Sequence, residues 1–267
     1  MKSFRLLCLS LFFLGSNYIS GNAQDSLLTV KKDTPLNSIG IKYDITFFDK
    51  GVGKPWQLVS TEYTRKLKKA SVIGRLNYAN RFGMSALQVE ADAYPKLGKN
   101  AYAYLNVGYS PSDKLFPRFR SGMSLYYSLP AAFEVEAGAR YLKFDEPIYI
   151  YTASVGKYYK KFWFNASTFL TPQNSNISSS YFFRTRYYLN DQDFIMLLLG
   201  TGLSPDNSVD NTLFNTYLKS RKVELTLRKA IQKNYILLLS TSISHQQILS
   251  DAYINQYNVS IGFQRGF

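Results

Sequence analysis

The chain has 267 residues, a formal charge of +14, one cysteine and one histidine. The cysteine, Cys8, lies among the first residues, which argues against a disulfide framework or a thiolate metal site in the rest of the chain. A single imidazole, His245, weakens most hydrolytic mechanisms, and we expect no cofactor and no metal.

The first 23 residues have the pattern of a secretory signal peptide. Lys2 and Arg5 form its basic start, LLCLSLFFLG (6–15) is its apolar run, and Gly21 to Ala23 offer small residues for cleavage. The run is too short to span a membrane. We expect cleavage near Ala23, a short N-terminal segment over 24–36, and an exported chain whose neighbours are anionic envelope polymers and lipids, not nucleic acid.

Tyrosine is frequent, with 22 residues, and suits a membrane–water interface because its ring can be buried while its hydroxyl stays wet. After the signal, no stretch is long enough for a membrane helix; the longest apolar runs are FIMLLL (194–199) and YILLL (235–239). Two classes remain, a secreted all-β protein and a closed barrel in an outer membrane.

Residues alternate between apolar and polar along most of the remaining chain. In SALQVEADAYP (85–95), every second residue from Leu87 to Ala93 is apolar and those between are polar, as in a strand with one greasy face. About fourteen segments share this pattern, and twelve remain if two merge or fail. They are 38–48, 56–66, 71–81, 85–94, 101–110, 118–128, 133–143, 148–158, 162–170, 179–189, 194–203, 217–229, 235–245 and 253–264.

The links between these segments alternate in length. Counted from a periplasmic N-terminus, every second link is short, and the others are generally longer. The short links are KLKK (66–69), PKLGKN (95–100), LPAA (129–132), YYKK (158–161), NDQD (190–193) and IQKN (231–234); the longer ones include DKGVGKP (49–55), PSDKLFP (111–117), TPQNSNISSS (171–180) and SPDNSVDNTLFNT (204–216). This arrangement predicts a transmembrane, antiparallel, up-and-down β-barrel over 37–267, with both termini periplasmic.

The last segment keeps its alternation to the final residue, Phe267. In a barrel the last strand pairs with the first and does not fray. Phe267 shares its face with Val259, Ile261 and Phe263, which places its ring on the lipid side at the membrane edge. A terminal aromatic residue of this kind is similar to the assembly signal of bacterial outer-membrane barrels, which predicts the barrel-assembly machinery as a partner.

The segment from about Pro35 to Phe267 resembles the YaiO family of outer-membrane β-barrel proteins. VEADAYPKLGKNAYAYLNVGYS (89–110), LFPRFRSGMSLYYSL (115–129) and FEVEAGARYLKF (133–144) carry the resemblance. It implies an outer-membrane barrel of a Gram-negative bacterium, and it brings no catalytic motif. Related barrels can follow helical repeats in polysaccharide-export proteins, whereas about a dozen residues separate the expected cleavage site from the first strand here. The short segment argues against direct export work, and the resemblance implies only a looser link to surface polysaccharide.

If the apolar face meets lipid, the other face lines the interior with charged side chains. The candidates are Glu62, Arg75, Glu90, Asp92, Arg118, Arg120, Glu134, Glu136, Arg140, Arg184, Arg186, Glu224 and Arg228. Because buried charges must be paired or hydrated, we expect Arg118 and Arg120 to pair with Glu134 and Glu136 on the next strand. The set predicts either an interior that satisfies itself with salt bridges or a constriction that selects solutes.

FIMLLLGTGL and YILLLSTSIS are apolar on both faces, as strands are when both faces are buried. We expect Met196 and Leu198, or else Ile195, Leu197 and Leu199, to meet an apolar element inside the barrel. Lysines gather at the short links, where they solubilise turns or form a basic rim for an anionic polysaccharide or an acidic partner.

His245 follows Ser244 directly, so the two side chains point to opposite faces of a strand and do not form a catalytic pair. Glu134 and Glu136 lie about 7 Å apart by strand rise, which alternation alone produces. The leading hypothesis is a non-enzymatic, porin-like passage or a structural protein of the envelope, in contact with outer-membrane lipids and lipopolysaccharide. A lipid-modifying barrel enzyme and a secreted all-β binding protein are the alternatives.

Overall fold

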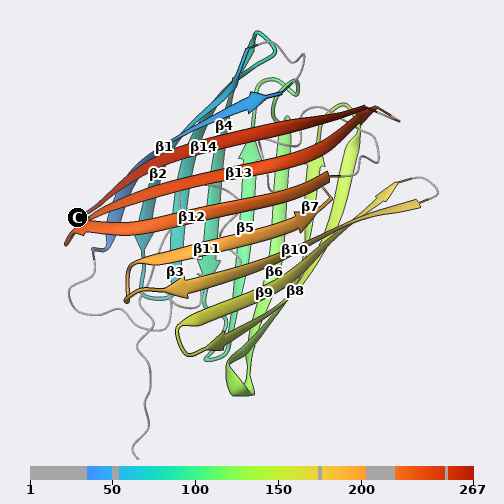
Figure 1. Cartoon of the computed structure of the whole chain (residues 1–267). Coiled ribbons are helices and arrows are strands. Elements are labelled where there is room, and N and C mark those ends of the chain that lie inside the picture. Colours follow the sequence, from blue (N-terminus) through green and yellow to red (C-terminus); the bar gives the residue numbers. More distant parts are fainter. Residues whose placement is uncertain (1–34, 50–53, 174–175, 203–219, 250–251) are drawn as a thin grey trace, which may run out of the picture.

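The computed structural model describes residues 35–49, 54–173, 176–202, 220–249 and 252–267. Fourteen antiparallel strands close into one barrel, in which each strand pairs with its sequence neighbours and β1 pairs with β14 (Figure 1). The strands are β1 (Asn37–Phe48), β2 (Trp56–Lys66), β3 (Ala70–Arg81), β4 (Met84–Pro95), β5 (Ala101–Tyr109), β6 (Phe119–Leu129), β7 (Phe133–Lys143), β8 (Pro147–Tyr159), β9 (Phe162–Gln173), β10 (Asn176–Tyr188), β11 (Phe194–Thr201), β12 (Ser220–Gln232), β13 (Tyr235–Leu249) and β14 (Ala252–Gly266).

The predicted barrel and its fourteen strands are confirmed. The signal peptide and the predicted link 204–216 lie outside the described residues. We call the end of the barrel where β1 begins and β14 finishes the terminal end. In the described residues no helix is both long and apolar enough to cross a membrane.

One predicted connection is wrong. TPQNSNISSS was expected to be a link, but β9 and β10 pair through most of it, with Ser178 opposite Thr171. Serine and threonine lack the apolar alternation that marks a membrane strand, yet their backbone can continue a ladder wherever both faces are polar. The β9–β10 hairpin therefore extends at the end opposite the termini (Figure 1).

Some links at that opposite end are short, although the longer links were expected there. Between β3 and β4 the described chain turns within Phe82 and Gly83, whose φ angles are 54° and 74°. Positive φ at both central residues is the geometry of a two-residue hairpin turn that matches the twist of its strands.

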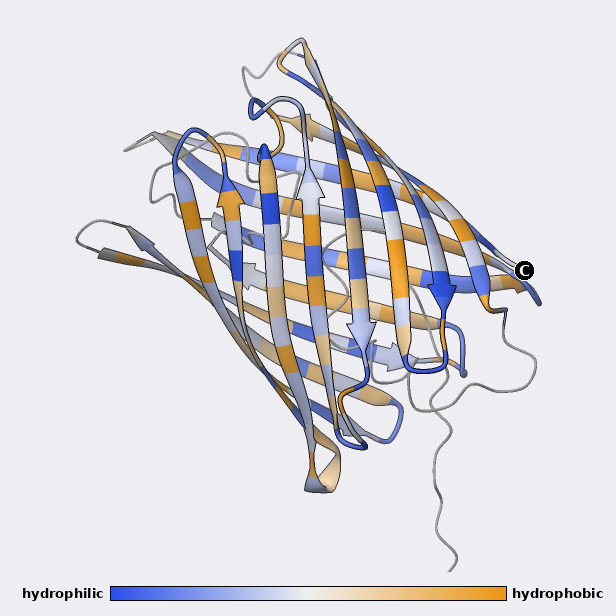
Figure 2. Cartoon of the chain, turned by 180° about the vertical axis from the view of Figure 1, so that it is seen from behind, coloured by the Kyte–Doolittle hydropathy of each residue, from blue (hydrophilic) through white to orange (hydrophobic). Residues whose placement is uncertain are grey.

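Apolar side chains face outward, and Figure 2 shows the resulting alternation as stripes along the strands. On β14, the outward residues from Tyr257 to Phe263 are 41–51% exposed, and the polar Asn255 and Arg265 flank them. Ten residues span about 33 Å of strand. With the usual tilt of a membrane strand, this corresponds to a band about 25 Å tall, the height of the apolar belt of outer-membrane barrels.

The barrel closes at its last residues. Asn37 and Phe267 exchange two backbone hydrogen bonds, of 3.1 and 2.9 Å, and the β1–β14 ladder runs from Ser38 opposite Gly266 to Phe48 opposite Gln256. The Phe267 side chain is 58% exposed, as expected for a ring at the edge of the lipid-facing side. No unpaired edge is left between the first and last strands.

Candidate functional site

Twelve of the thirteen predicted lining residues are buried on the face opposite the exposed apolar side chains, each with 7% exposure or less. The exception is Arg118. It precedes β6, its side chain is 61% exposed, and it lies 3.7 Å from Asp113 in the same link. Arg118 has the inward parity of β6, but the strand begins one residue later, so its guanidinium stays in solvent.

The strongest cluster of buried charges centres on Arg75 of β3. Its guanidinium donates to Glu62 at 3.1 Å, to Glu90 at 2.7 Å and to Asp92 at 3.0 Å. Register explains the arrangement, because Arg75 lies directly opposite Glu62 on β2 and Glu90 on β4. The planar fork of arginine allows one side chain to serve three carboxylates.

A second arginine completes this cluster. Arg120 donates to Glu90 at 2.9 Å and to Asn106 at 3.1 Å, and the Asn106 amide donates to Asp92 at 2.6 Å. Tyr104 adds a hydroxyl donor to Asp92 at 3.2 Å. The three carboxylates thus meet two guanidinium groups and several neutral donors.

The predicted pairing of Arg118 and Arg120 with Glu134 and Glu136 is wrong. β6 and β7 are antiparallel, so the start of β6 lies beside the end of β7, and Arg120 faces Leu142. Glu134 lies opposite Ser128, at the other end of the hairpin. Adjacency in sequence did not bring the four charges together.

Glu136 instead belongs to a mixed group on β7 and β8. Arg140 is 3.9 Å from Glu136, donates to Ser124 at 2.9 Å, and lies 4.8 Å from the centroid of the Tyr104 ring. Ser154 donates to Glu136 at 2.9 Å. The Glu136 carboxylate therefore has both a positively charged neighbour, Arg140, and a neutral donor, Ser154.

Hydroxyl groups and aromatic rings contact the arginines on the wall formed by β9 and β10. Arg184 donates to Ser167 at 2.9 Å. Arg186 lies over two rings, with its guanidinium carbon 4.3 Å from the centroid of Phe194 and 4.9 Å from that of Trp163. Such cation–π contacts stabilise a buried guanidinium without cancelling its charge.

β12 adds a further arginine to this side. Arg228 is 1% exposed and donates through Nη1 to the backbone carbonyl of Gln192. Among the described inward residues of β10 to β12, Glu224 is the one carboxylate, and it accepts from Lys222 at 3.2 Å and from Thr226 at 3.3 Å. The β10–β12 wall is therefore cationic.

Met196 and Leu198 face inward with 1% and 4% exposure, whereas Ile195, Leu197 and Leu199 are 39–44% exposed outside. The inward choice is confirmed. Met196 packs with Phe194 and Leu238, and Leu198 belongs to an apolar cluster with Leu142, Ile150, Phe169 and Phe182. Their apolar neighbours are thus inward side chains of other strands.

The link between β5 and β6 enters the barrel at the end opposite the termini, which was not predicted from the sequence. Leu115 and Phe116, in the link between β5 and β6, are 2% and 1% exposed and pack against the inward residues Leu58, Ala79 and Ala86. The apolar pair inside the polar link PSDKLFP was the sequence signal for it.

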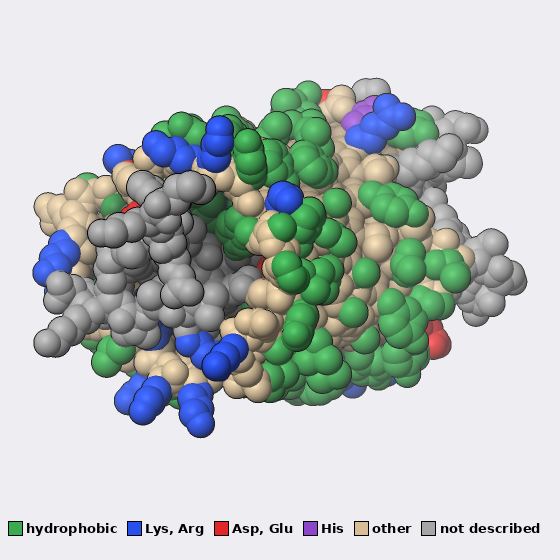
Figure 3. Space-filling model, turned by 90° about the horizontal axis from the view of Figure 1, so that it is seen from below, with side chains coloured by type: hydrophobic (Ala, Val, Ile, Leu, Met, Phe, Trp, Pro, Cys, Tyr) green, Lys and Arg blue, Asp and Glu red, His purple; other side chains and the backbone are tan. Residues whose placement is uncertain are grey.

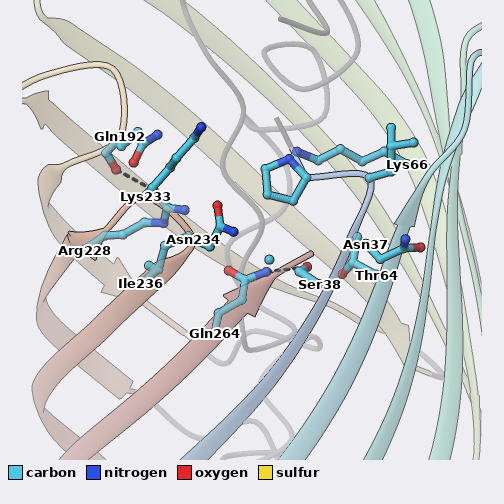
Figure 4. A pocket seen from close by; sticks show the side chains of 13 residues that line it. Asn37, Ser38, Thr64, Lys66, Gln192, Arg228, Lys233, Asn234, Ile236 and Gln264 are labelled. Carbon is cyan, nitrogen blue, oxygen red and sulfur yellow. Dashed lines mark hydrogen bonds between the residues drawn. The ribbon is translucent and has the colours of Figure 1, made fainter. Parts of the chain in front are cut away.

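A pocket of about 560 Å³, open to solvent, lies at the terminal end, and we call it the terminal pocket (Figure 4). Polar side chains from β1, β2, β12 and β14 and from two links line it. They are Asn37, Ser38, Thr64, Lys66, Gln192, Arg228, Lys233, Asn234 and Gln264. Of these, Arg228 alone was a predicted lining residue; Lys66 and Lys233 were assigned to the lysine-rich links.

Lysines and arginines gather around the terminal end, while hydrophobic side chains cover the wall (Figure 3). One carboxylate in a link at this end is held tightly. Burial by itself would raise the pKa of Asp193, but hydrogen bonds from the Ala230 amide at 2.7 Å, Lys229 at 2.6 Å and Asn190 at 2.9 Å hold that pKa below its usual value.

His245 lies on the outside of the barrel, where its ring stacks on Tyr253 with centroids 4.8 Å apart. Its Nδ1 is 2.8 Å from Asn255 Oδ1, while Ser244 is buried on the inward face. The two point to opposite faces, as predicted. In the described part of the chain, no group of three histidine, cysteine or carboxylate side chains is placed to hold a metal ion.

A family model described as the YaiO membrane beta barrel domain matches residues 36–207, and no protein of curated function matches by sequence. Solved structures match over most of their length. CymD, a monoaromatic hydrocarbon channel, is 8% identical, with 88% of this chain and 89% of that chain covered and a TM-score of 0.60. A bacterial polysaccharide outer membrane secretin is 10% identical (88% and 99% covered, TM-score 0.59), and the Pseudomonas putida toluene transporter TodX is 11% identical (98% and 100%, TM-score 0.58). At these identities the likeness shows the fold alone.

Proposed function

Because the chain belongs to the YaiO family of membrane β-barrels, we propose that it is a non-enzymatic outer-membrane barrel that provides a narrow, anion-selective passage. Export with cleavage near Ala23 and a periplasmic position of both termini are part of this proposal. Contacts with lipopolysaccharide and with the barrel-assembly machinery, and a link to surface polysaccharide, also belong to it.

The observation that carries the proposal is the uneven distribution of charge inside the barrel. On β2 to β6, the carboxylates of Glu62, Glu90 and Asp92 are engaged closely by Arg75 and Arg120. On β10 to β12, Arg184, Arg186 and Arg228 bring three guanidinium groups inward, and Glu224 is the one carboxylate among the described inward residues. Cationic walls favour anions in pores, and the effect is strong where water is scarce.

A neutral polar lane adjoins the cationic wall. The buried inward residues of β13 and β14 include Ser242, Ser244, Gln246, Gln256, Ser260 and Gln264. Hydroxyl and amide groups can replace part of the hydration shell of a solute without binding it as tightly as a charge would. In the proposed passage, an anion would move along this lane beside the arginines.

The close packing of the interior supports a narrow passage over a wide pore. The twelve predicted lining residues that are buried have only 1–7% of their surface exposed. The same observation favours the second candidate function, a closed structural barrel of the envelope. The geometry of His245 supports a non-enzymatic role, because its serine neighbour lies on the other face.

Reversal potentials across a planar bilayer with a KCl gradient separate these candidates. We expect small single-channel currents with chloride more permeant than potassium. Arg184→Gln should move the permeability ratio toward unity, because it removes one charge from the cationic wall. Arg118→Gln, which removes an exposed charge outside the barrel, is the matched control. A silent bilayer would support the structural candidate, and selectivity for potassium would contradict the proposal.

A further inference from the structure

The terminal pocket is a cationic site with polar walls. Lys66 from β2, Arg228 from β12 and Lys233 from the β12–β13 link line it, and no carboxylate does so among the described residues. In Figure 4, Lys66 extends from one side of the pocket toward Arg228 and Lys233 on the other. A ligand between them would meet positive charge from two sides.

Arg228 gives this pocket a buried donor. The side chain is 1% exposed, and only Nη1 is bonded in the described structure, to the carbonyl of Gln192; its Nε–H has no hydrogen-bond partner there. An unfilled donor on a buried cation is costly, and an anion that accepts from it would remove the cost.

The carboxylate of the neighbouring link does not fill this role. Asp193 accepts from the Ala230 amide through Oδ1 and from Lys229 and Asn190 through Oδ2. Asp193 is not among the residues that line the pocket. Its hydrogen bonds therefore go to residues of β12 other than Arg228 and to its own link.

The remaining lining groups suit hydroxyl groups. Gln264 donates to Ser38 at 2.8 Å, while its carbonyl oxygen, Oε1, is buried without a partner among the described residues. Thr64 and Asn234 add a hydroxyl and an amide. The pocket is open to solvent at this end of the barrel, so the part of a ligand that its walls do not hold can extend into water.

We propose that the terminal pocket binds a small sugar acid or sugar phosphate, with the anionic group on Lys66, Arg228 and Lys233 and the sugar hydroxyls on Gln264 and its neighbours. This inference rests on the proposed function in that it names the solute class for which the passage would have a binding site. Charge-assisted hydrogen bonds supply the affinity, and the amides select a hydroxylated ligand.

Isothermal titration calorimetry on the mature full-length barrel in detergent tests the proposal. Glucuronate and glucose 6-phosphate are the probes, glucose is the neutral control, and inorganic phosphate reports the anion alone. We expect both sugar anions to bind, glucose not to bind, and inorganic phosphate to bind more weakly than glucose 6-phosphate. Binding of glucose as tight as that of the acids, or binding of neither acid, would overturn the site. Equal affinity for inorganic phosphate would overturn the sugar assignment.

Lys233→Gln should weaken binding of both acids by about tenfold, the order expected for the loss of one charge-assisted hydrogen bond. Its side chain is exposed in a link, so the variant should fold even if Arg228→Gln does not. Lys161→Gln, in another link at the same end and outside the pocket, is the matched control. Equal losses in both variants would refute the site. Binding without conductance would refute the passage and leave the site standing, and conductance without binding would do the reverse.

Discussion

Arg75 shows how a single residue organises the interior. Three carboxylates from β2 and β4 lie within hydrogen-bonding distance of its guanidinium, and each of the four side chains is nearly inaccessible. Carboxylates that are this close and this dry repel one another unless a cation lies between them. Lysine, with a compact ammonium, does not offer the same fork.

Arg75→Gln should therefore lower the free energy of unfolding by about 3–5 kcal/mol, because it leaves buried carboxylates without their shared partner. Urea unfolding of the barrel in phospholipid vesicles measures the change. Arg118→Gln, at an exposed arginine, should change it by no more than about 0.5 kcal/mol. Similar values for both variants would show that the cluster does not stabilise the barrel.

Among the elements, the link between β5 and β6 departs most from a simple barrel. A short link such as the one between β3 and β4 turns the chain within two residues, but this longer link places Leu115 and Phe116 against the inward face of β2 to β4. Burial of each large apolar side chain stabilises by about 1.5–3 kcal/mol, enough to hold the link inside. The link thus narrows the barrel at the end opposite the termini.

Replacement of both Leu115 and Phe116 by asparagine should release this link, because burying an amide without a hydrogen-bond partner is unfavourable whereas an amide in water is fully hydrated. We expect a higher single-channel conductance in planar bilayers. Lys114→Gln, an exposed position in the same link, is the control and should conduct like the unmodified protein. An unchanged conductance in the double variant would mean that the link does not limit the passage.

The elements could be predicted from the sequence because a membrane strand repeats every two residues and lipid covers one face. Parity left two choices open for the run that contains Met196, because that run is apolar on both faces, and the structure shows Met196 on the inward face. Partners could not be predicted, since they depend on register across strands that the periodicity does not specify. The error for Arg120, which pairs with Glu90 and not with β7, arose in this way. The terminal pocket draws its walls from residues as far apart as Ser38 and Gln264, and no local pattern marks such a meeting.

At the scale of the whole molecule, closure depends on a seam between the two ends of the chain. β1 and β14 pair over eleven residues, and the backbone of Phe267 is bonded to that of Asn37. A barrel that fails to close leaves an open edge inside the membrane, where unpaired backbone groups are very costly.

Deletion of Phe267 should reduce assembly, because it removes both the last backbone pair and the outward ring at the edge of the belt. The fraction of outer-membrane protein that migrates differently before and after heating on a gel measures folded barrel. Phe267→Tyr keeps the aromatic ring and the backbone bonds, and it should assemble normally. Full assembly of the deletion variant would contradict a role for the terminal residue.

The apolar band between Asn255 and Arg265 also determines which bilayer accommodates this protein without distortion. Its height of about 25 Å is several ångströms less than the hydrocarbon core of an average bilayer, about 30 Å thick. Acyl chains beside the wall must shorten or disorder in a thicker lipid phase, at a cost that rises with each ångström of mismatch. Short-chain lipids should therefore solvate the barrel best. The height of the apolar band then favours thin membranes over thick ones as the place where this protein resides.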